Sequence, residues 1–228
     1  MTVIVLLGAP GAGKGTQAPA LASRLGVPVL ASGDLLRQAV ADGTALGREA
    51  DRYMSRGQLV PDETIVRVFL DRLEAPDAVT GAILDSFPRT KVQAEALDAA
   101  FEEAGRRVDR AAYIDVPLED LVKRMANRRI CTANGHVYNL VSNPPRELVC
   151  DLDGSPLVQR ADDAEATVRA RMAQQVPPLL EVVEHYRAAG VLMIVDGREP
   201  ISEVSQRVLT AMDAPFTPSS AAPAEPAG

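Results

Sequence analysis

The feature that most constrains this chain is a glycine-rich stretch that follows an apolar run at the N-terminus. The run Thr2–Leu7 is rich in β-branched residues and does not alternate with polar ones, which predicts a strand buried on both faces. Gly8–Gly15 contains four glycines, and apolar residues then recur at helical spacing over Thr16–Leu25. The glycines therefore lie at a turn from a strand into a helix.

Such a turn is suited to holding phosphate groups. Glycines let backbone N–H groups converge on an anion, the helix N-terminus adds partial positive charge, and Lys14 adds a full charge. The strict pattern Gly-x-x-x-x-Gly-Lys-Ser/Thr is missed by one position, because Gly15 follows Lys14 and the hydroxyl comes at Thr16. We interpret the stretch as a variant of that pattern. The predicted phosphate-binding residues are Gly11, Ala12, Gly13, Lys14, Gly15 and Thr16.

Composition narrows the class of protein. A chain of 228 residues can bury one main core and carry a small insertion or two. The net charge of −7 argues against broad nucleic-acid binding. No apolar run is long enough to cross a bilayer and no basic signal-peptide head is present, so we expect a cytoplasmic protein that does not bind membranes. Two cysteines are too few for a secreted disulfide scaffold.

Strands and helices alternate along the chain, which predicts an α/β fold with a doubly wound parallel sheet that binds ligands at its carboxyl edge. Further strands are expected at 27–30, 82–85, 111–116 and 191–195. Asp85 ends one of these apolar runs, where an acid can orient the hydration shell of Mg²⁺. Arg89 follows at the same edge.

The later part of the chain carries an arginine cluster and a change of pattern. We expect a helix over Leu118–Arg129, whose last turns hold Arg124, Arg128 and Arg129. These arginines are either helix-end charges or a clamp for a polyphosphate. From 130 to 159 short strands and turns predict a small β-rich insertion that is free to move, and a long helix follows over 164–189.

Six blocks in this order resemble the adenylate kinase family, of the bacterial type with a long lid. They are Gly8–Thr16, Ser32–Arg37, Asp85–Arg89, Gln93, Arg128–Arg129 and the segment Arg160-x-Asp-Asp163 with Arg171. The resemblance covers about residues 1 to 212. It implies a P-loop NTPase type of fold, with a core over 1–212, an AMP-binding module inserted at 31–60 and an ATP lid inserted at 127–164. The tail at 213–228 lies outside the resemblance, and its Ala-, Pro- and Ser-rich composition predicts disorder.

The resemblance also implies a reaction, the reversible Mg²⁺-dependent transfer of a phosphoryl group from ATP to AMP that gives two ADP. The AMP side would be formed by Ser32, Arg37, Gln58, Leu59, Val60, Ser86, Phe87, Pro88, Arg89 and Gln93. The phosphates and the ATP base would be surrounded by Arg124, Arg128, Val137, Tyr138, Arg160, Arg171 and, at a weaker match, Arg198. Because the AMP phosphate is already largely dianionic near neutral pH, this reaction needs no general base.

Two departures from the family pattern bear on the expected site. Ser86 stands where the family usually has Gly, so the backbone there either tolerates a Cβ or binds AMP less well. Some relatives hold zinc in the lid with four cysteines, or with three and Asp, whereas this chain has Cys131-x-x-Asn134 and Cys150-x-x-Asp153. The alternatives are a hydrogen-bonded polar cluster, zinc with His136 or water as the missing ligand, and a Cys131–Cys150 disulfide. We expect no bound metal, because Asn is a poor zinc ligand.

Other functions remain as rivals. A kinase for UMP, CMP or GMP would share most of these motifs. A GTP-dependent switch would need an Asn-Lys-x-Asp base reader, which the chain lacks. An inactive scaffold would have little reason to keep so many arginines in order. We expect ATP and AMP or ADP as the partners and a monomeric state.

Overall fold

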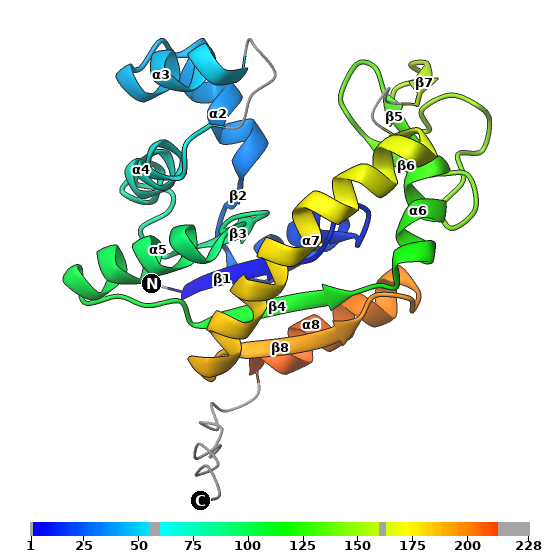
Figure 1. The fold of residues 1–228 in the computed structure, drawn as a ribbon. Helices are drawn as coiled ribbons and strands as arrows, with labels where there is room; N and C mark the ends of the chain where they lie inside the picture. Colours follow the sequence, from blue (N-terminus) through cyan, green and yellow to red (C-terminus); the bar gives the residue numbers. More distant parts are fainter. Residues whose placement is uncertain (1, 55–59, 160–162, 214–228) are drawn as a thin grey trace, which may run out of the picture.

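The computed structural model describes residues 2–54, 60–159 and 163–213, which form a core with two arms (Figure 1). The core contains a five-stranded sheet in the order β2-β3-β1-β4-β8, and every pair is parallel. The strands are β1 (Thr2–Leu7), β2 (Val29–Ala31), β3 (Gly81–Asp85), β4 (Arg110–Asp115) and β8 (Leu192–Asp196). The prediction of a doubly wound parallel sheet is therefore confirmed.

Helices cover both faces of this sheet, which explains why β1 is apolar throughout. Its side chains Val3, Val5 and Leu7 belong to one buried cluster, and Ile4 and Leu6 belong to another. The first face packs against α4 (Asp62–Leu73), α5 (Lys91–Glu103), α6 (Leu118–Ala126) and α7 (Glu165–Ala188). The second face packs against α1 (Lys14–Leu25) and α8 (Ile201–Asp213). A strand buried on both sides cannot alternate apolar with polar residues.

The first arm is helical and has a small core of its own. It contains α2 (Ser32–Ala41) and α3 (Ala45–Met54), which pack against α4. Leu36, Leu46, Ala50, Val60 and Val68 form its buried cluster. Because α2 follows β2 directly, this arm leaves the sheet from its carboxyl edge.

The second arm is a three-stranded antiparallel sheet in the order β6-β5-β7, and it lies where the sequence predicts a β-rich insertion. Its strands are β5 (Arg128–Cys131), β6 (Val137–Asn139) and β7 (Leu157–Val158). The prediction that the preceding helix runs to Arg129 is wrong. α6 ends at Ala126, and Arg128 and Arg129 lie in β5, where they pair with β6. The pairing with β6 fixes an extended backbone at these positions. The helical spacing of the preceding residues does not indicate this strand pairing.

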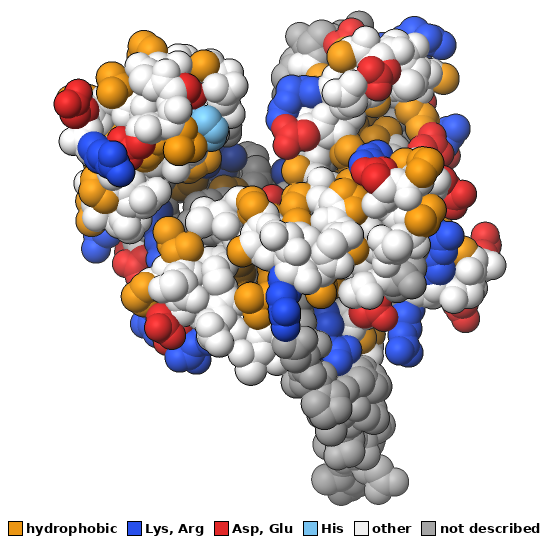
Figure 2. All heavy atoms as spheres, turned by 180° about the vertical axis from the view of Figure 1, so that it is seen from behind, with side chains coloured by type: hydrophobic (Ala, Val, Ile, Leu, Met, Phe, Trp, Pro, Cys, Tyr) orange, Lys and Arg blue, Asp and Glu red, His pale blue; other side chains and the backbone are white. Residues whose placement is uncertain are grey.

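The two arms rise on either side of a hollow (Figure 2). α6 follows β4 just as α2 follows β2, so both arms leave the sheet at the same edge. Across the residues that the structure describes, no helix is both long and apolar enough to span a membrane.

Candidate active site

The register of the sheet brings three loops together at its carboxyl edge. Asp85, the last residue of β3, lies opposite Leu6 of β1 and opposite Ala31 of β2. The glycine-rich loop, Ser32 and Ser86 therefore all start from neighbouring strand ends. This juxtaposition is the one expected for a ligand site in a doubly wound sheet.

The glycine-rich loop has the backbone that its sequence predicts. Gly11 has φ of 85° and Gly13 has φ of 105°, a region that other residues rarely adopt. A Cβ on Gly11 would lie 3.0 Å from Cγ of Met125, so α6 also leaves no room for a side chain there. α1 begins at Lys14, two residues earlier than the periodicity indicated. The loop thus presents the N-terminus of α1 to any bound anion.

Lys14 is buried beside this loop and carries a charge that the protein stabilises poorly. Its Nζ donates to the carbonyl oxygens of Gly8, at 2.7 Å, and Ala9, at 3.3 Å. Burial lowers the pKa of Lys14 to about 8; nearby Asp85 opposes this shift, and nearby Arg89 adds to it. A phosphate beside Lys14 would supply the negative charge that it lacks.

The charge of Arg89 is likewise held in unfavourable surroundings. Although the residue is exposed, partial desolvation of its guanidinium lowers its pKa, Asp85 raises it, and the nearby charge of Arg171 lowers it. Arg89 thus lies close enough to Lys14 to lower the pKa of Lys14, and Arg171 close enough to Arg89 to lower the pKa of Arg89, while Asp85 opposes both shifts. A cluster of cations that repel one another is a site prepared for an anion.

Hydrogen bonds hold Arg89 against three of the predicted AMP residues. Its Nε donates to the carbonyl oxygen of Ser86, at 2.8 Å, and its Nη2 donates to Oγ of Ser32, at 3.1 Å. Its backbone N–H donates to Oε1 of Gln93, at 2.7 Å. The structure therefore brings together Ser32, Ser86, Arg89 and Gln93, from three separate elements.

Asp62 is a residue of this site that the sequence did not single out. Its carboxylate accepts from Nε2 of Gln93, at 2.7 Å, and from Oγ1 of Thr90, at 2.9 Å. Oγ1 of Thr90 also accepts the backbone N–H of Gln93 and so caps α5. Asp62 thereby fixes the amide orientation of Gln93, whose side chain is buried. An acid in the first turn of a helix is common, so nothing local marked Asp62.

The loop after β3 shows the backbone conformation at Ser86, which stands where the family usually has Gly. Ser86 has φ of 61°, in the left-handed region that favours glycine, and its Oγ donates to Oδ1 of Asp85 at 2.9 Å. The next peptide bond, Phe87–Pro88, is cis. The side chain of Phe87 stacks on Phe69 in the core, with ring centroids 3.9 Å apart. Only the backbone of Phe87 is therefore available to a ligand, while Ser86 keeps its Cβ at a strained position.

Four of the other predicted arginines are engaged with protein groups. Arg37 pairs with Asp34 on the exposed surface of α2. Arg124 donates to the carbonyl oxygen of Gly197, at 2.6 Å, and Arg198 pairs with Asp196. Nε and Nη2 of Arg128 donate to the two carboxylate oxygens of Asp163, which is fully buried. These contacts hold Arg124 and Arg128 at the base of the second arm.

Other predicted residues differ in exposure. Ala12, Val60 and Pro88 are buried, whereas Gly15 and Thr16 are exposed at the start of α1. Val137 is exposed on β6, but Tyr138 is buried in the second arm. Gln58, Leu59 and Arg160 lie outside the residues that the structure describes.

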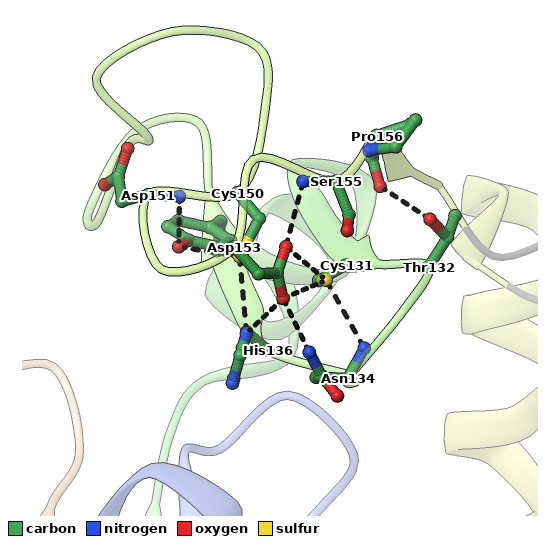
Figure 3. A network of polar contacts seen from close by, with 10 residues as sticks. Cys131, Thr132, Asn134, His136, Cys150, Asp151, Asp153, Ser155 and Pro156 are labelled. Atoms are coloured by element: carbon green, nitrogen blue, oxygen red, sulfur yellow. Dashed lines mark hydrogen bonds and ion pairs between the residues drawn. The ribbon is translucent and has the colours of Figure 1, made fainter.

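The second arm gathers the polar residues that the sequence analysis left with three alternatives (Figure 3). Cys131 and Cys150 are buried and both are free thiols, so the structure does not contain the disulfide. Nδ1 of His136 lies 3.3 Å from Sγ of Cys150 and 3.4 Å from Oδ2 of Asp153. Asn134 donates from Nδ2 to Oδ2 of Asp153, at 2.8 Å.

Known proteins are similar to this chain in sequence. Residues 6–191 match the family described as Adenylate kinase. The chain is 43% identical to an adenylate kinase of Caldicellulosiruptor bescii over 92% of its own length and 98% of the relative. It is 44% identical to an adenylate kinase of Streptomyces avermitilis, over 92% and 96%. It is 43% identical to one of Staphylococcus aureus, over 92% and 98%. The site at the carboxyl edge and these matches together show that the chain belongs to the adenylate kinase family.

Proposed function

We propose that this protein catalyses the reversible, Mg²⁺-dependent transfer of the γ-phosphoryl group of ATP to AMP, giving two ADP. The observation that carries the proposal is the cation cluster at the sheet edge. Lys14 and Arg89 come from separate elements, and their pKa values are lowered by desolvation and by like charge nearby. Phosphoryl transfer between two nucleotides requires a site that neutralises several phosphate charges at once.

The ATP side is assigned to the glycine-rich loop and its surroundings. The backbone N–H groups of 11–16 would bind the phosphates, with Lys14 beside them. Mg²⁺ prefers oxygen ligands, and Asp85 and Thr16 offer oxygens that would contact the ion directly or through its bound waters. The ion would neutralise phosphate charge. The other residues that we assign to ATP are Arg124, Arg128, Val137, Tyr138 and Arg198. For Tyr138 the assignment requires the ring to be reached at its exposed edge, because the side chain is mostly buried.

The AMP side is assigned to the first arm and the loop after β3. Ser32 and Arg89 already contact each other, which supports a binding role for both. Gln93 is held by Asp62 and by the backbone of Arg89, so an adenine contact would use its remaining hydrogen-bonding capacity. The assigned residues are Ser32, Arg37, Gln58, Leu59, Val60, Ser86, Phe87, Pro88, Arg89 and Gln93.

The chemistry needs positioning and charge rather than proton transfer. The acceptor oxygen of AMP is already deprotonated, so arginines serve by aligning the phosphates in line and by stabilising the charge of the transition state. Arg89, Arg160 and Arg171 are assigned this role together with Arg124 and Arg128. Water would compete for the phosphoryl group, so we propose that the modules 31–60 and 127–164 close over the nucleotides.

The proposal is tested by incubating the protein with ATP and Mg²⁺ in the presence of AMP, UMP, CMP or GMP and measuring initial rates of ADP formation. We expect AMP to be the preferred acceptor and expect no ADP without Mg²⁺. A faster rate with UMP, CMP or GMP would favour the rival kinase. In a parallel incubation with GTP and Mg²⁺, hydrolysis of GTP without transfer would favour a switch. The monomeric state and the cytoplasmic location stay predictions, the first open to light scattering.

A further inference from the structure

We infer that Asp62 determines which purine the acceptor site takes, and that it acts through Gln93. Its carboxylate holds the Gln93 amide in the one orientation that complements the hydrogen-bonding edge of adenine and opposes that of guanine. Asp62 is therefore a positioning residue, which need not touch the nucleotide itself. The inference rests on the proposed function, because it concerns which monophosphate that site accepts.

The first argument is that the Gln93 amide is held at both ends. Its Nε2 donates to Oδ1 of Asp62, at 2.7 Å, and its Oε1 accepts the backbone N–H of Arg89, at 2.7 Å. An ionised carboxylate can only accept a hydrogen bond, and a backbone N–H can only donate one. Turning the amide over would set oxygen against the carboxylate and nitrogen against the N–H. The amide therefore has one favourable orientation.

The second argument is that Asp62 is itself fixed. Its other oxygen, Oδ2, accepts from Oγ1 of Thr90, at 2.9 Å, and the same Oγ1 accepts the backbone N–H of Gln93, at 3.2 Å. These bonds close a ring that joins the first residue of α4 to the first turn of α5. Because Gln93 is only 3% exposed, water competes little for its amide. The ring thus keeps the Asp62 carboxylate facing Gln93.

The third argument is the hydrogen-bonding capacity that remains on Gln93. Within the described part of the chain, the bonds to Asp62 and Arg89 take one N–H group and one lone pair of the amide. A side-chain amide has two of each, so one donor on Nε2 and one acceptor on Oε1 are left for a ligand. A base that pairs with both must offer an acceptor opposite Nε2 and a donor opposite Oε1.

The two purines differ in this respect. Adenine has an acceptor at ring nitrogen N1 and a donor in its 6-amino group, whereas guanine has a hydrogen on N1 and a carbonyl at position 6. In the fixed orientation Gln93 complements adenine. Guanine in the same place would set donor against donor and acceptor against acceptor, and a site with such unpaired polar groups rejects the analogue strongly.

The experiment compares Asp62→Asn with the unaltered protein. The substitution keeps the shape of the side chain, but an amide can either accept from Gln93 or donate to it, so it no longer dictates an orientation. We expect the ratio of kcat/KM for AMP to kcat/KM for GMP to fall by about tenfold or more, because a hydrogen bond to a charged group is lost. KM for AMP should rise, while kcat and KM for ATP stay nearly unchanged.

A double-mutant cycle separates positioning from a general structural role. Gln93→Met keeps most of the bulk of the side chain and removes the amide. In that background Asp62→Asn should change the ratio no further, because Asp62 acts through the amide that is missing. An equal change in the presence and absence of the Gln93 amide would overturn the inference.

Glu63→Gln is the matched control, since it removes the exposed carboxylate next to Asp62 in the same first turn of α4 and should leave the ratio unchanged. Calorimetric binding of AMP and GMP to each variant gives a readout that does not need turnover. Equal affinity of the unaltered protein for AMP and GMP would overturn the inference, and so would a folded Asp62→Asn variant with undiminished preference for AMP. Preferential binding of AMP without phosphoryl transfer would overturn the proposed reaction alone.

Discussion

At the scale of single residues, the site consists of charges that the protein holds in unfavourable surroundings. Lys14 is buried, and its Nζ donates to two carbonyl oxygens, while Arg89 has Lys14 and Arg171 nearby. Such an arrangement reduces the stability of the nucleotide-free protein. Phosphate binding would relieve this unfavourable electrostatic energy, so the site is preorganised for an anion.

Arg89→Ala should lower turnover by about two to four orders of magnitude and leave the fold intact, since it removes a donor aimed at phosphate charge in a site that the proposed closure of the two arms would shield from water. Steady-state ADP formation and circular dichroism would measure the two effects. Arg187→Ala is the matched control, because Arg187 is an exposed arginine paired with Glu184 on α7. Near-normal turnover of a folded Arg89→Ala variant would remove Arg89 from the site.

Lys14 should take up a proton when ATP binds at about pH 8.5. Its pKa of about 8 in the free protein leaves it partly neutral there, and an adjacent phosphate raises that pKa, so the bound state holds more protons. Calorimetric titrations in buffers of different ionisation enthalpy would measure the uptake. At about pH 6.5, where Lys14 is already charged, its contribution should vanish. Equal proton uptake by Lys14→Met at about pH 8.5 would assign the effect to another group.

Ser86 should tolerate glycine but not a β-branched residue. At φ of 61° Ser86→Gly relieves backbone strain, although it loses the bond to Asp85 and gains freedom in the unfolded chain. We expect these effects to offset within about 1 kcal/mol. Ser86→Val should lower the free energy of unfolding by about 2 kcal/mol or more. Urea denaturation of both variants would decide, and equal stability of Val and Gly would contradict the strain.

At the scale of elements, the first arm depends on the close approach of α2 and α3. A Cβ on Gly47 of α3 would lie 1.8 Å from the carbonyl oxygen of Ala39 in α2, which the backbone cannot accommodate without moving. Because α2 also carries Ser32 and Arg37, the helix contact positions part of the proposed AMP site. The contact is between backbones, so no pattern of side chains in the sequence announced it.

Gly47→Ala should therefore lower the free energy of unfolding by about 2–3 kcal/mol, as overpacking of a rigid contact does. It should also weaken AMP binding, while ATP binding at the glycine-rich loop stays nearly unchanged. Arg52→Ala is a suitable control, since Arg52 is exposed on the same helix and should change stability by less than about 0.5 kcal/mol. A fully stable Gly47→Ala variant would mean that the two helices can separate at little cost.

At the scale of the whole molecule, the sequence was informative where a signal is local. Thr2–Leu7 and the glycines after it predicted a buried strand and a phosphate loop, because apolar periodicity and glycine backbone freedom act over a few residues. The contacts of Asp62 and Phe87 have no such local signal. The bonds of Asp62 to Gln93 and the stacking of Phe87 on Phe69 join segments far apart in the chain.

The second arm shows the same limit. The helix expected over Leu118–Arg129 would put Arg128 in its last turn, but pairing with β6 and the buried Asp163 determines its position. The sequence left three alternatives for the residues around Cys131 and Cys150. Only the fold of the second arm places Nδ1 of His136 beside Sγ of Cys150, while Asn134 donates its backbone N–H to Sγ of Cys131 and its Nδ2 to Asp153.

The central claim is that both nucleotides bind at the carboxyl edge of one sheet, between the two arms. The most direct test is a crystal structure with a bisubstrate analogue in which a polyphosphate joins two adenosines. The polyphosphate should run from the glycine-rich loop, past Lys14, to Arg89, with one adenosine toward the first arm and the other toward the second. An analogue bound without contact to Lys14 and Arg89, or on another surface, would contradict this account.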